Sequence, residues 1–295
     1  WIFNGGTLNV SAGFTTTKTG AMTGAGTIDI DSGQTLNASG VFSGTGGALT
    51  KSGDGILVLS ATNTYTQGTV MAGGTVRIAA SNNLGTGGLT FNGGTLHATS
   101  DITTSKTAAM SGAGTIAVDN GQTLTMTGVF SGTGGALTKS GGGVLALSGT
   151  NTYSQGSTIS EGTLKVGADA NMGTGAITFD GGTLNTTGSF TSTKGVAMSG
   201  AGTILTDSAT TVTLSGVVSG SGGALTKSGS GSLVLSGINT YSGGTEFAAG
   251  TLSAGADSNL GAGNLTFNGG TLLATGSFDS SKLSSFTGAG SIEVD

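Results

Sequence analysis

Few side chains in this chain of 295 residues are equipped for acid–base or metal chemistry. The chain has 14 acidic residues, nine basic residues, a single histidine (His97) and no cysteine. Enzymes that cleave polysaccharides need clustered carboxylates, or a carboxylate close to Arg or Lys. The surroundings of His97 and of Arg77, the only arginine, therefore bear directly on an enzyme interpretation.

The sequence repeats with a period of 88, so each residue can be compared with its copies. Residues 40–53, GVFSGTGGALTKSG, recur unchanged at 128–141 and with two changes at 216–229. The copies of His97 are Asn9, Asn185 and Leu273, and those of Arg77 are Lys165 and Ser253. Because these places accept such different residues, we predict that His97 and Arg77 are outward surface residues without a catalytic role.

The recurring acidic residues follow predicted strands and suit turns. They are Asp31, Asp119, Asp207 and Asp295. Turn aspartates accept local backbone N–H bonds, which explains them without calcium. Asp29 with Asp31 resembles a weak cation site, but the copies of Asp29 are Ala117 and Leu205, and the GGxGxD calcium pattern is absent. We expect no catalytic, cofactor-binding or metal-binding residues, and no cofactor.

Lysines recur at two places in the unit. They are Lys18, Lys106, Lys194 and Lys282 at one place, and Lys51, Lys139 and Lys227 at the other. We interpret both sets as sparse solubilising charges.

A net charge of −5 with nine scattered basic residues argues against a nucleic-acid partner. No apolar run approaches the ~20 residues that span a membrane.

The elements that position these residues are short and evenly spaced. Within one unit, a glycine, a small residue and an aliphatic residue recur, with the aliphatics at Leu8, Ile28, Leu49, Val76 and Leu96. The steps average about 22 residues, which suits one coil of a β-solenoid and is too short for a helix pair. Abundant glycine (61 residues) supplies turns with positive φ, and the absence of proline leaves every ladder N–H available.

Neither disorder nor collagen fits this composition. Hydrophobic residues make up 35% of the chain at regular intervals, whereas disordered chains are poor in them. Collagen needs glycine at every third position together with proline.

Alternation within the repeated segments predicts strands and a core. In 56–60, 144–148 and 232–236 the second and fourth residues are always Leu, while the first and third vary. The predicted core contains Leu57, Leu59, Leu145, Leu147, Leu233, Leu235, Phe3, Phe91, Phe179, Phe267, Ile28, Ile116, Ile204, Ile292, Met22, Met110, Met198 and Phe286.

These observations predict an all-β chain folded as a right-handed parallel β-helix (β-solenoid) of about 22 residues per coil. Coils ~4.8 Å apart make a rod of about 13 coils, on the order of 60 Å long. We expect one continuous β-solenoid over 1–295, with four-coil super-repeats at 1–88, 89–176 and 177–264 and a partial one at 265–295.

A recurring Asn-Thr-Tyr triplet begins at Asn63, Asn151 and Asn239. Tyrosine is common at binding surfaces, but the triplet opens the longest step of the unit. We favour a structural role, in which the asparagine makes a turn and the ring packs over the extra loop. Thr15 with Thr17 and Thr191 with Thr193 resemble ice-binding ladders, which need the motif on nearly every coil and not on one in four.

Residues 49–76, LTKSGDGILVLSATNTYTQGTVMAGGTV, resemble the autotransporter-associated β-strand repeat of bacterial type V secreted passengers, with the pattern GxLTKxGxGxLxLSGxNTYxGGTxxxxGTL. Residues 137–164 and 225–252 match as well. The resemblance implies an extracellular, surface-displayed stalk that carries or presents adhesive activity. No signal peptide or C-terminal run of amphipathic membrane strands is present, so we expect passenger material alone, or a relative exported differently.

The expected function is thus a non-catalytic stalk or adhesin segment, on a bacterial surface or secreted, that serves adhesion or biofilm formation. The alternative is a self-assembling extracellular filament or matrix subunit that stacks head to tail through uncapped ends. A polysaccharide-degrading enzyme is the least favoured class. The expected partners are other copies or adjoining coils at the rod ends, and a host or neighbouring cell surface.

Overall fold

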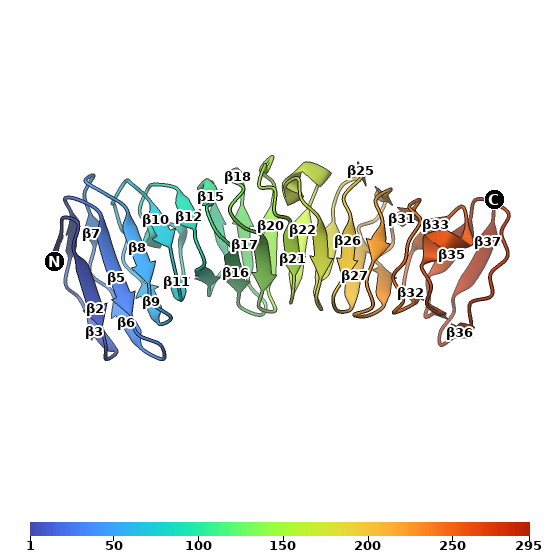
Figure 1. The fold of residues 1–295 in the computed structure, drawn as a ribbon, viewed down its shortest axis with the longest axis horizontal. Coiled ribbons are helices and arrows are strands. Elements are labelled where there is room, and N and C mark those ends of the chain that lie inside the picture. Colours follow the sequence, from blue (N-terminus) through green and yellow to red (C-terminus); the bar gives the residue numbers. More distant parts are fainter. The chain divides into compact units, whose positions relative to one another are not determined.

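A computed structural model describes residues 1–295 and contains only short strands and three 3-10 turns (Figure 1). The strands form a parallel β-solenoid of about 15 turns with about 20 residues per turn. The predicted all-β parallel solenoid is confirmed, while each turn is somewhat shorter than the sequence anchors predicted. Its handedness and its continuity over the whole chain stay predictions. Two compact units, residues 1–155 and 156–295, are described separately.

Unit 1 (residues 1–155) contains four groups of stacked parallel strands, each named here by its first strand. The β1 sheet contains β1 (Ile2–Phe3), β4 (Gly20–Met22) and β7 (Phe42–Ser43). The β2 sheet contains β2 (Thr7–Val10), β5 (Gly26–Ile30), β8 (Leu49–Ser52), β10 (Thr69–Met71), β12 (Leu89–Phe91), β15 (Ala108–Met110) and β18 (Phe130–Ser131). The β3 sheet contains β3 (Phe14–Thr16), β6 (Thr35–Ala38), β9 (Ile56–Leu59), β11 (Thr75–Ile78), β13 (Thr95–Ala98), β16 (Gly114–Val118) and β19 (Leu137–Ser140). The β14 sheet contains β14 (Ile102–Thr104), β17 (Thr123–Met126) and β20 (Val144–Leu147).

Unit 2 (residues 156–295) has three groups of parallel strands. The β21 sheet contains β21 (Ser157–Ile159), β23 (Ile177–Phe179), β26 (Val196–Met198) and β29 (Val218–Ser219). The β22 sheet contains β22 (Thr163–Val166), β24 (Thr183–Thr186), β27 (Gly202–Thr206), β30 (Leu225–Ser228), β32 (Thr245–Phe247), β34 (Leu265–Phe267) and β36 (Ser284–Phe286). The β25 sheet contains β25 (Phe190–Ser192), β28 (Thr211–Leu214), β31 (Ser232–Leu235), β33 (Thr251–Ala254), β35 (Thr271–Ala274) and β37 (Ser291–Val294).

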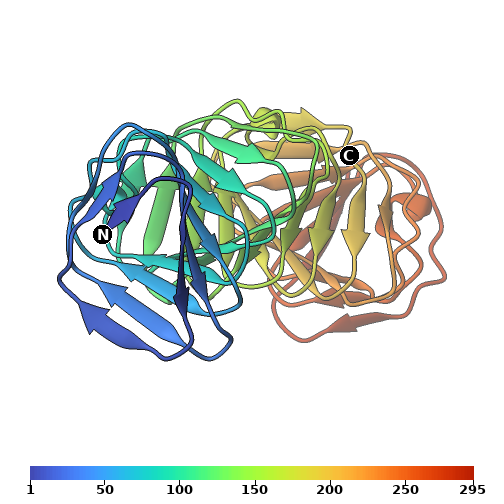
Figure 2. The same cartoon turned by 60° about the vertical axis from the view of Figure 1, so that its left-hand side comes forward.

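One turn of the chain visits three sheets before it returns to the first, as β4, β5 and β6 do before β7. Figure 2 shows the turns of unit 1, in blue to green, more nearly end-on, with strands along the sides and loops at the corners. Residues at the same height pair in strict parallel register, as Leu8 pairs with Ile28. In unit 2 the stacked rings of Phe247 and Phe267 lie 4.5 Å apart between centroids, close to the spacing of neighbouring strands.

The interior is formed by the alternate residues that the sequence predicted. Leu57, Leu145 and Leu233 are fully buried, and the predicted phenylalanines and isoleucines of the first three copies are buried as well. Two predicted core residues are exposed: Phe286 at 58% and Ile292 at 54%. They lie on β36 and β37, the last strands of their sheets, so no further turn covers them.

The repeat of the sequence does not correspond to a whole number of turns. Along the β2 sheet, Thr7 pairs with Thr27, and the ladder continues through Thr50 and Val70 to Thr90. Four turns therefore lead from Thr7 to Thr90, whereas one repeat leads from Thr7 to Thr95. Thr95 consequently lies on β13 of the β3 sheet, where it pairs with Thr75.

The same displacement occurs in unit 2. Thr183 is on β24 of the β22 sheet, whereas its copy Thr271 is on β35 of the β25 sheet. Within each unit, the later copy thus starts in a different sheet from the earlier one. Equivalent residues are not stacked above one another after four coils, contrary to the prediction of a four-coil super-repeat.

The buried position of Leu145 provides a test of the interior. We expect Leu145→Asp to lower the free energy of unfolding by several kcal/mol, because an unpaired carboxylate is placed among aliphatic side chains. Ala146→Asp, one residue along and on the outward side of β20, is the matched control and should change stability by less than about 0.5 kcal/mol. Urea unfolding followed by circular dichroism measures both variants, and equal midpoints for the two would contradict the assignment.

Candidate functional site

His97 lies on the outer side of β13, as predicted, and has a partner that the sequence analysis missed. Its Nε2 lies 2.6 Å from Oδ1 of Asp119, and the two side chains are 24% and 41% exposed. Arg77 is exposed on β11, where its Cα is paired with that of His97. Asp119 follows His97 by about one turn, which is the signal that links them. No group of three or more His, Cys, Asp or Glu side chains gathers in the structure to hold a metal ion.

The predicted role of the turn aspartates is wrong in its detail. The backbone carbonyl of Asp31, and not its carboxylate, accepts the turn bond from the backbone N–H of Gln34. Asp207 uses its carboxylate to reach the preceding turn instead, where Oδ1 accepts a bond from Nδ2 of Asn185 at 2.9 Å. The side chain of Asn185 is within reach because residues about one turn apart lie side by side.

The lysines at 51, 139 and 227 are buried, so their interpretation as solubilising charges is wrong. They are at most 1% exposed. Lys51 points inward in the β2 sheet, where it stands between Ile28 and Met71 in the ladder. Its stem packs as an interior aliphatic chain, and only its ammonium needs polar partners.

Backbone carbonyls at the adjoining corner satisfy the ammonium. Nζ of Lys51 donates to the carbonyl oxygens of Ser52 at 2.5 Å, Gly53 at 2.7 Å and Gly73 at 3.4 Å. Lys227 repeats this arrangement with the carbonyls of Ser228, Gly229 and Ala249 at 2.7, 2.8 and 3.0 Å. We call this arrangement the lysine corner.

Glycine makes the lysine corner possible. Gly53 and Gly229 have φ of 68° and 71°, which a residue with a side chain rarely adopts. A Cβ on Gly250 would lie 2.9 Å from Nζ of Lys227 and 2.3 Å from the carbonyl oxygen of Gly229. The lysine and the glycines of the motif therefore form a single packed corner.

The second lysine set is also less exposed than predicted. Lys18 is exposed, but Lys194 pairs with Asp169 and Lys282 with Asp257, each at 2.5 Å. The side chains of these two lysines are only 8% exposed. Lys106, the copy in the second super-repeat, is half-buried and donates to the carbonyls of Gly85 and Gly87 instead.

The asparagine of the Asn-Thr-Tyr triplet replaces a missing strand. On the side of unit 1 where β7 lies, the chain forms no strand at 60–68 or at 79–88, and the next strand on that side is β14. Oδ1 of the buried Asn63 accepts the backbone N–H of Phe42 at 2.7 Å, and its Nδ2 donates to the carbonyl of Asn83 at 2.6 Å. Asn239 makes the same two contacts in unit 2, with Val218 and Asn259.

A second buried asparagine closes each 3-10 turn. These turns are η1 (Ser81–Leu84), η2 (Asp169–Met172) and η3 (Asp257–Leu260). Oδ1 of Asn83 accepts the backbone N–H groups of Ala79 and Ala80, and its Nδ2 donates to the carbonyl of Ala61. Asn63 and Asn83 together form what we call the asparagine bracket.

The tyrosine of the triplet is fully buried, as the structural interpretation predicted. The hydroxyl groups of Tyr65 and Thr69 are 2.6 Å apart, and those of Tyr241 and Thr245 are also 2.6 Å apart. Burial raises the pKa of both phenols, that of Tyr241 to about 12, although the threonine bonds lower it. These rings are not available to a partner at the surface.

The three 3-10 turns are the only helical elements, and none has the length or the apolar character of a membrane-spanning helix.

Removal of an ammonium tests the lysine corner. Lys227→Met keeps a chain of similar length but leaves three carbonyl oxygens without this donor, so we expect a loss of about 1–3 kcal/mol in unfolding free energy. Lys165→Met, at an exposed place, is the control and should be neutral within about 0.5 kcal/mol. Denaturant unfolding compares them, and a stability gain in Lys227→Met would show that the charge is merely tolerated.

The buried lysines and tyrosines predict an unusual dependence of stability on pH. Burial lowers the pKa of Lys51 and Lys227 to about 8, while the acidic residues Asp29 and Asp54 raise that of Lys51. The unfolded lysines titrate near 10.5, so above pH 8 the unfolded state binds more protons and stability rises with pH.

Above pH 10 the sign reverses, because unfolded tyrosines ionise while Tyr65 and Tyr241 remain protonated in the fold. Calorimetric melting temperatures should therefore rise from pH 8 to about 10 and then fall. The double variant Lys51→Met with Lys227→Met should lose most of the rise and keep the fall, because burial also lowers the pKa of Lys106. A monotonic decline in the parent from pH 8 would contradict these pKa directions.

Comparison with known families identifies the segments that carry the lysine corners and the first asparagine of each bracket. The passenger-associated-transport-repeat model matches residues 49–78, 137–166 and 225–254, each of which contains one buried motif lysine and the asparagine and tyrosine of one triplet. No curated protein and no solved structure gave a significant match. The chain is thus a β-solenoid that carries three passenger-associated-transport repeats, consistent with the passenger of an autotransporter built from β-strand repeats.

Proposed function

We propose that residues 1–295 form a non-catalytic stalk or adhesin segment that is displayed on a bacterial surface or secreted. The observation that carries the proposal is that the polar side chains of the repeat motif lie inside the fold. Its chemically capable residues, Lys51, Asn63 and Tyr65, are all buried and bonded within the chain. The repeat thus serves to build the fold rather than to present a reactive group.

The outer surface supports the same proposal. Nε2 of His97 lies 2.6 Å from the carboxylate of Asp119. The copies of His97 are Asn and Leu, so the repeat does not retain a titratable residue at this place. Passenger repeats imply an extracellular or surface-exposed region. A secreted chain without cysteine needs another source of stability, and turns that each contact their neighbours supply it.

A surface-display experiment tests the proposal. Cells that present the whole chain on an outer-membrane anchor should attach to a host-cell layer or to one another more than cells with the empty anchor. The double variant His97→Ala with Arg77→Ala should attach equally well, because it leaves the buried motif intact. Reducing ends released from polysaccharides by the parent chain, and not by the double variant, would establish an enzyme instead.

A further inference from the structure

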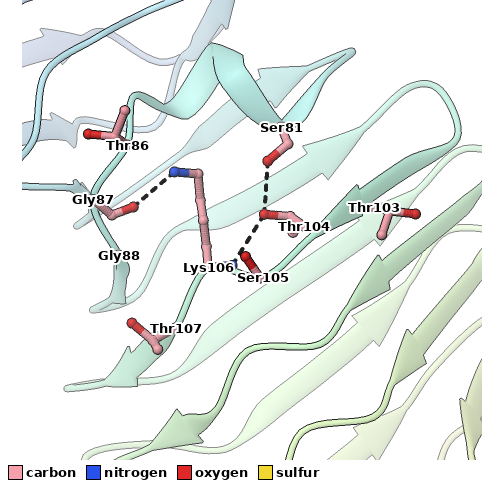
Figure 3. A pocket seen from close by; sticks show the side chains of 9 residues that line it. All are labelled: Ser81, Thr86, Gly87, Gly88, Thr103, Thr104, Ser105, Lys106 and Thr107. Carbon is pink, nitrogen blue, oxygen red and sulfur yellow. Dashed lines mark hydrogen bonds between the residues drawn. The ribbon is translucent and has the colours of Figure 1, made fainter.

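An open pocket of about 410 Å³ lies beside η1 in unit 1, between the loop at 85–88 and the segment that follows β14. Ser81, Thr86, Ser105, Lys106 and Thr107 contribute to its lining, and Figure 3 shows them around it. Its volume is within the range of small-molecule sites. Hydroxyl groups and one ammonium dominate the lining, which favours a polar, anionic ligand over an apolar one.

The two later copies of this place, 88 and 176 residues further along the chain, show what it holds when it is filled from within the chain. In the first of them, Nζ of Lys194 lies 2.5 Å from Oδ2 of Asp169 and 3.3 Å from the carbonyl oxygen of the same residue. The second has the same pair at the same sequence separation, Lys282 with Asp257, at 2.5 Å. In both aspartates, the second carboxylate oxygen is buried without a partner.

The place beside η1 retains the lysine but lacks the carboxylate. Ser81 stands where Asp169 and Asp257 stand, at the same separation from its lysine, Lys106. The Ser81 hydroxyl donates to Oγ1 of Thr104 at 2.8 Å and does not bond the ammonium (Figure 3). Nζ of Lys106 donates to the carbonyl oxygens of Gly85 and Gly87, which leaves the third N–H donor without a protein acceptor.

We propose that the pocket between Ser81 and Lys106 binds an acidic sugar, with the carboxylate of a hexuronate in the place that Asp169 and Asp257 occupy in the two later copies. The ammonium of Lys106 pairs with the carboxylate, as its copies do with aspartate. The hydroxyls of Ser105 and Thr107 line the pocket and offer donors and acceptors to the ring hydroxyls, while the hydroxyl of Thr86 donates to the carbonyl oxygen of Tyr65 and offers an acceptor. The site goes beyond the stalk or adhesin role and does not depend on it.

Calorimetric titration of the whole chain with glucuronate tests the site. We expect one saturable site per chain. Glucose lacks the carboxylate and acetate lacks the ring, and each should bind at least about tenfold more weakly than glucuronate. Absence of saturable glucuronate binding, or equal binding of glucose or acetate, would overturn the proposal.

Two variants locate the binding. Ser81→Asp installs the internal carboxylate of the two later copies, and it should reduce glucuronate affinity at least about tenfold while the melting temperature is unchanged or raised. Lys106→Met should reduce the affinity as much, whereas Lys194→Met, whose ammonium is already paired, is the matched control and should bind as the parent does. If Ser81→Asp is folded and binds glucuronate with parental affinity, the ligand lies elsewhere and the assignment fails.

Discussion

The backbone ladder between successive turns is the constraint on which the rest of this structure depends. Each N–H and C=O inside a turn must find its partner in the turn before or after it, because water cannot reach most of them. Strands meet this demand on most of the surface, and the chain contains no proline to leave a ladder position empty. Where strands are missing beside η1, Asn63 and Asn83 supply the donors and acceptors that a strand would have supplied. The asparagine bracket is thus a repair of the ladder by side chains.

The same constraint explains why a narrow apolar interior contains three ammonium groups. At a corner the chain turns away from the ladder, and some carbonyl oxygens lose their backbone partners. Lys51 reaches such a corner from inside, so its charge is placed against carbonyl dipoles rather than against aliphatic side chains. Charges that remain partnered by several polar atoms can be buried at acceptable cost, whereas isolated ones cannot. The motif lysine and its glycines are therefore coupled features of one corner.

Sequence patterns predicted the strands and the aliphatic core, because alternation of Leu57 and Leu59 reports directly which side of a strand is covered. The lysines were wrongly predicted to be exposed because a charged side chain normally faces water, although their position along the strand indicates an inward side chain. Lys51 follows Leu49 by two places on one strand, which puts both on the same side, and the lysine does not vary among the three copies. The partner of His97 was missed for another reason. Pairing of His97 with Asp119 depends on which residues of neighbouring turns lie side by side. The recurring aliphatic residues show which positions are alike in sequence, and these are not the positions that stack.

The surplus of each repeat over four whole turns has a consequence for how nearly identical segments find their places during folding. Identical strands that stack in register can exchange partners with one another, which is a known hazard of repetitive β-proteins. Here a duplicated segment belongs to a different sheet from its copy, as Thr7 and Thr95 do. A strand that slipped by one whole repeat would match in sequence but would arrive at the wrong side of the turn, with its corner glycines out of place. Duplication with this surplus therefore lengthens the solenoid while it places each copy in a different sheet from the copy before it.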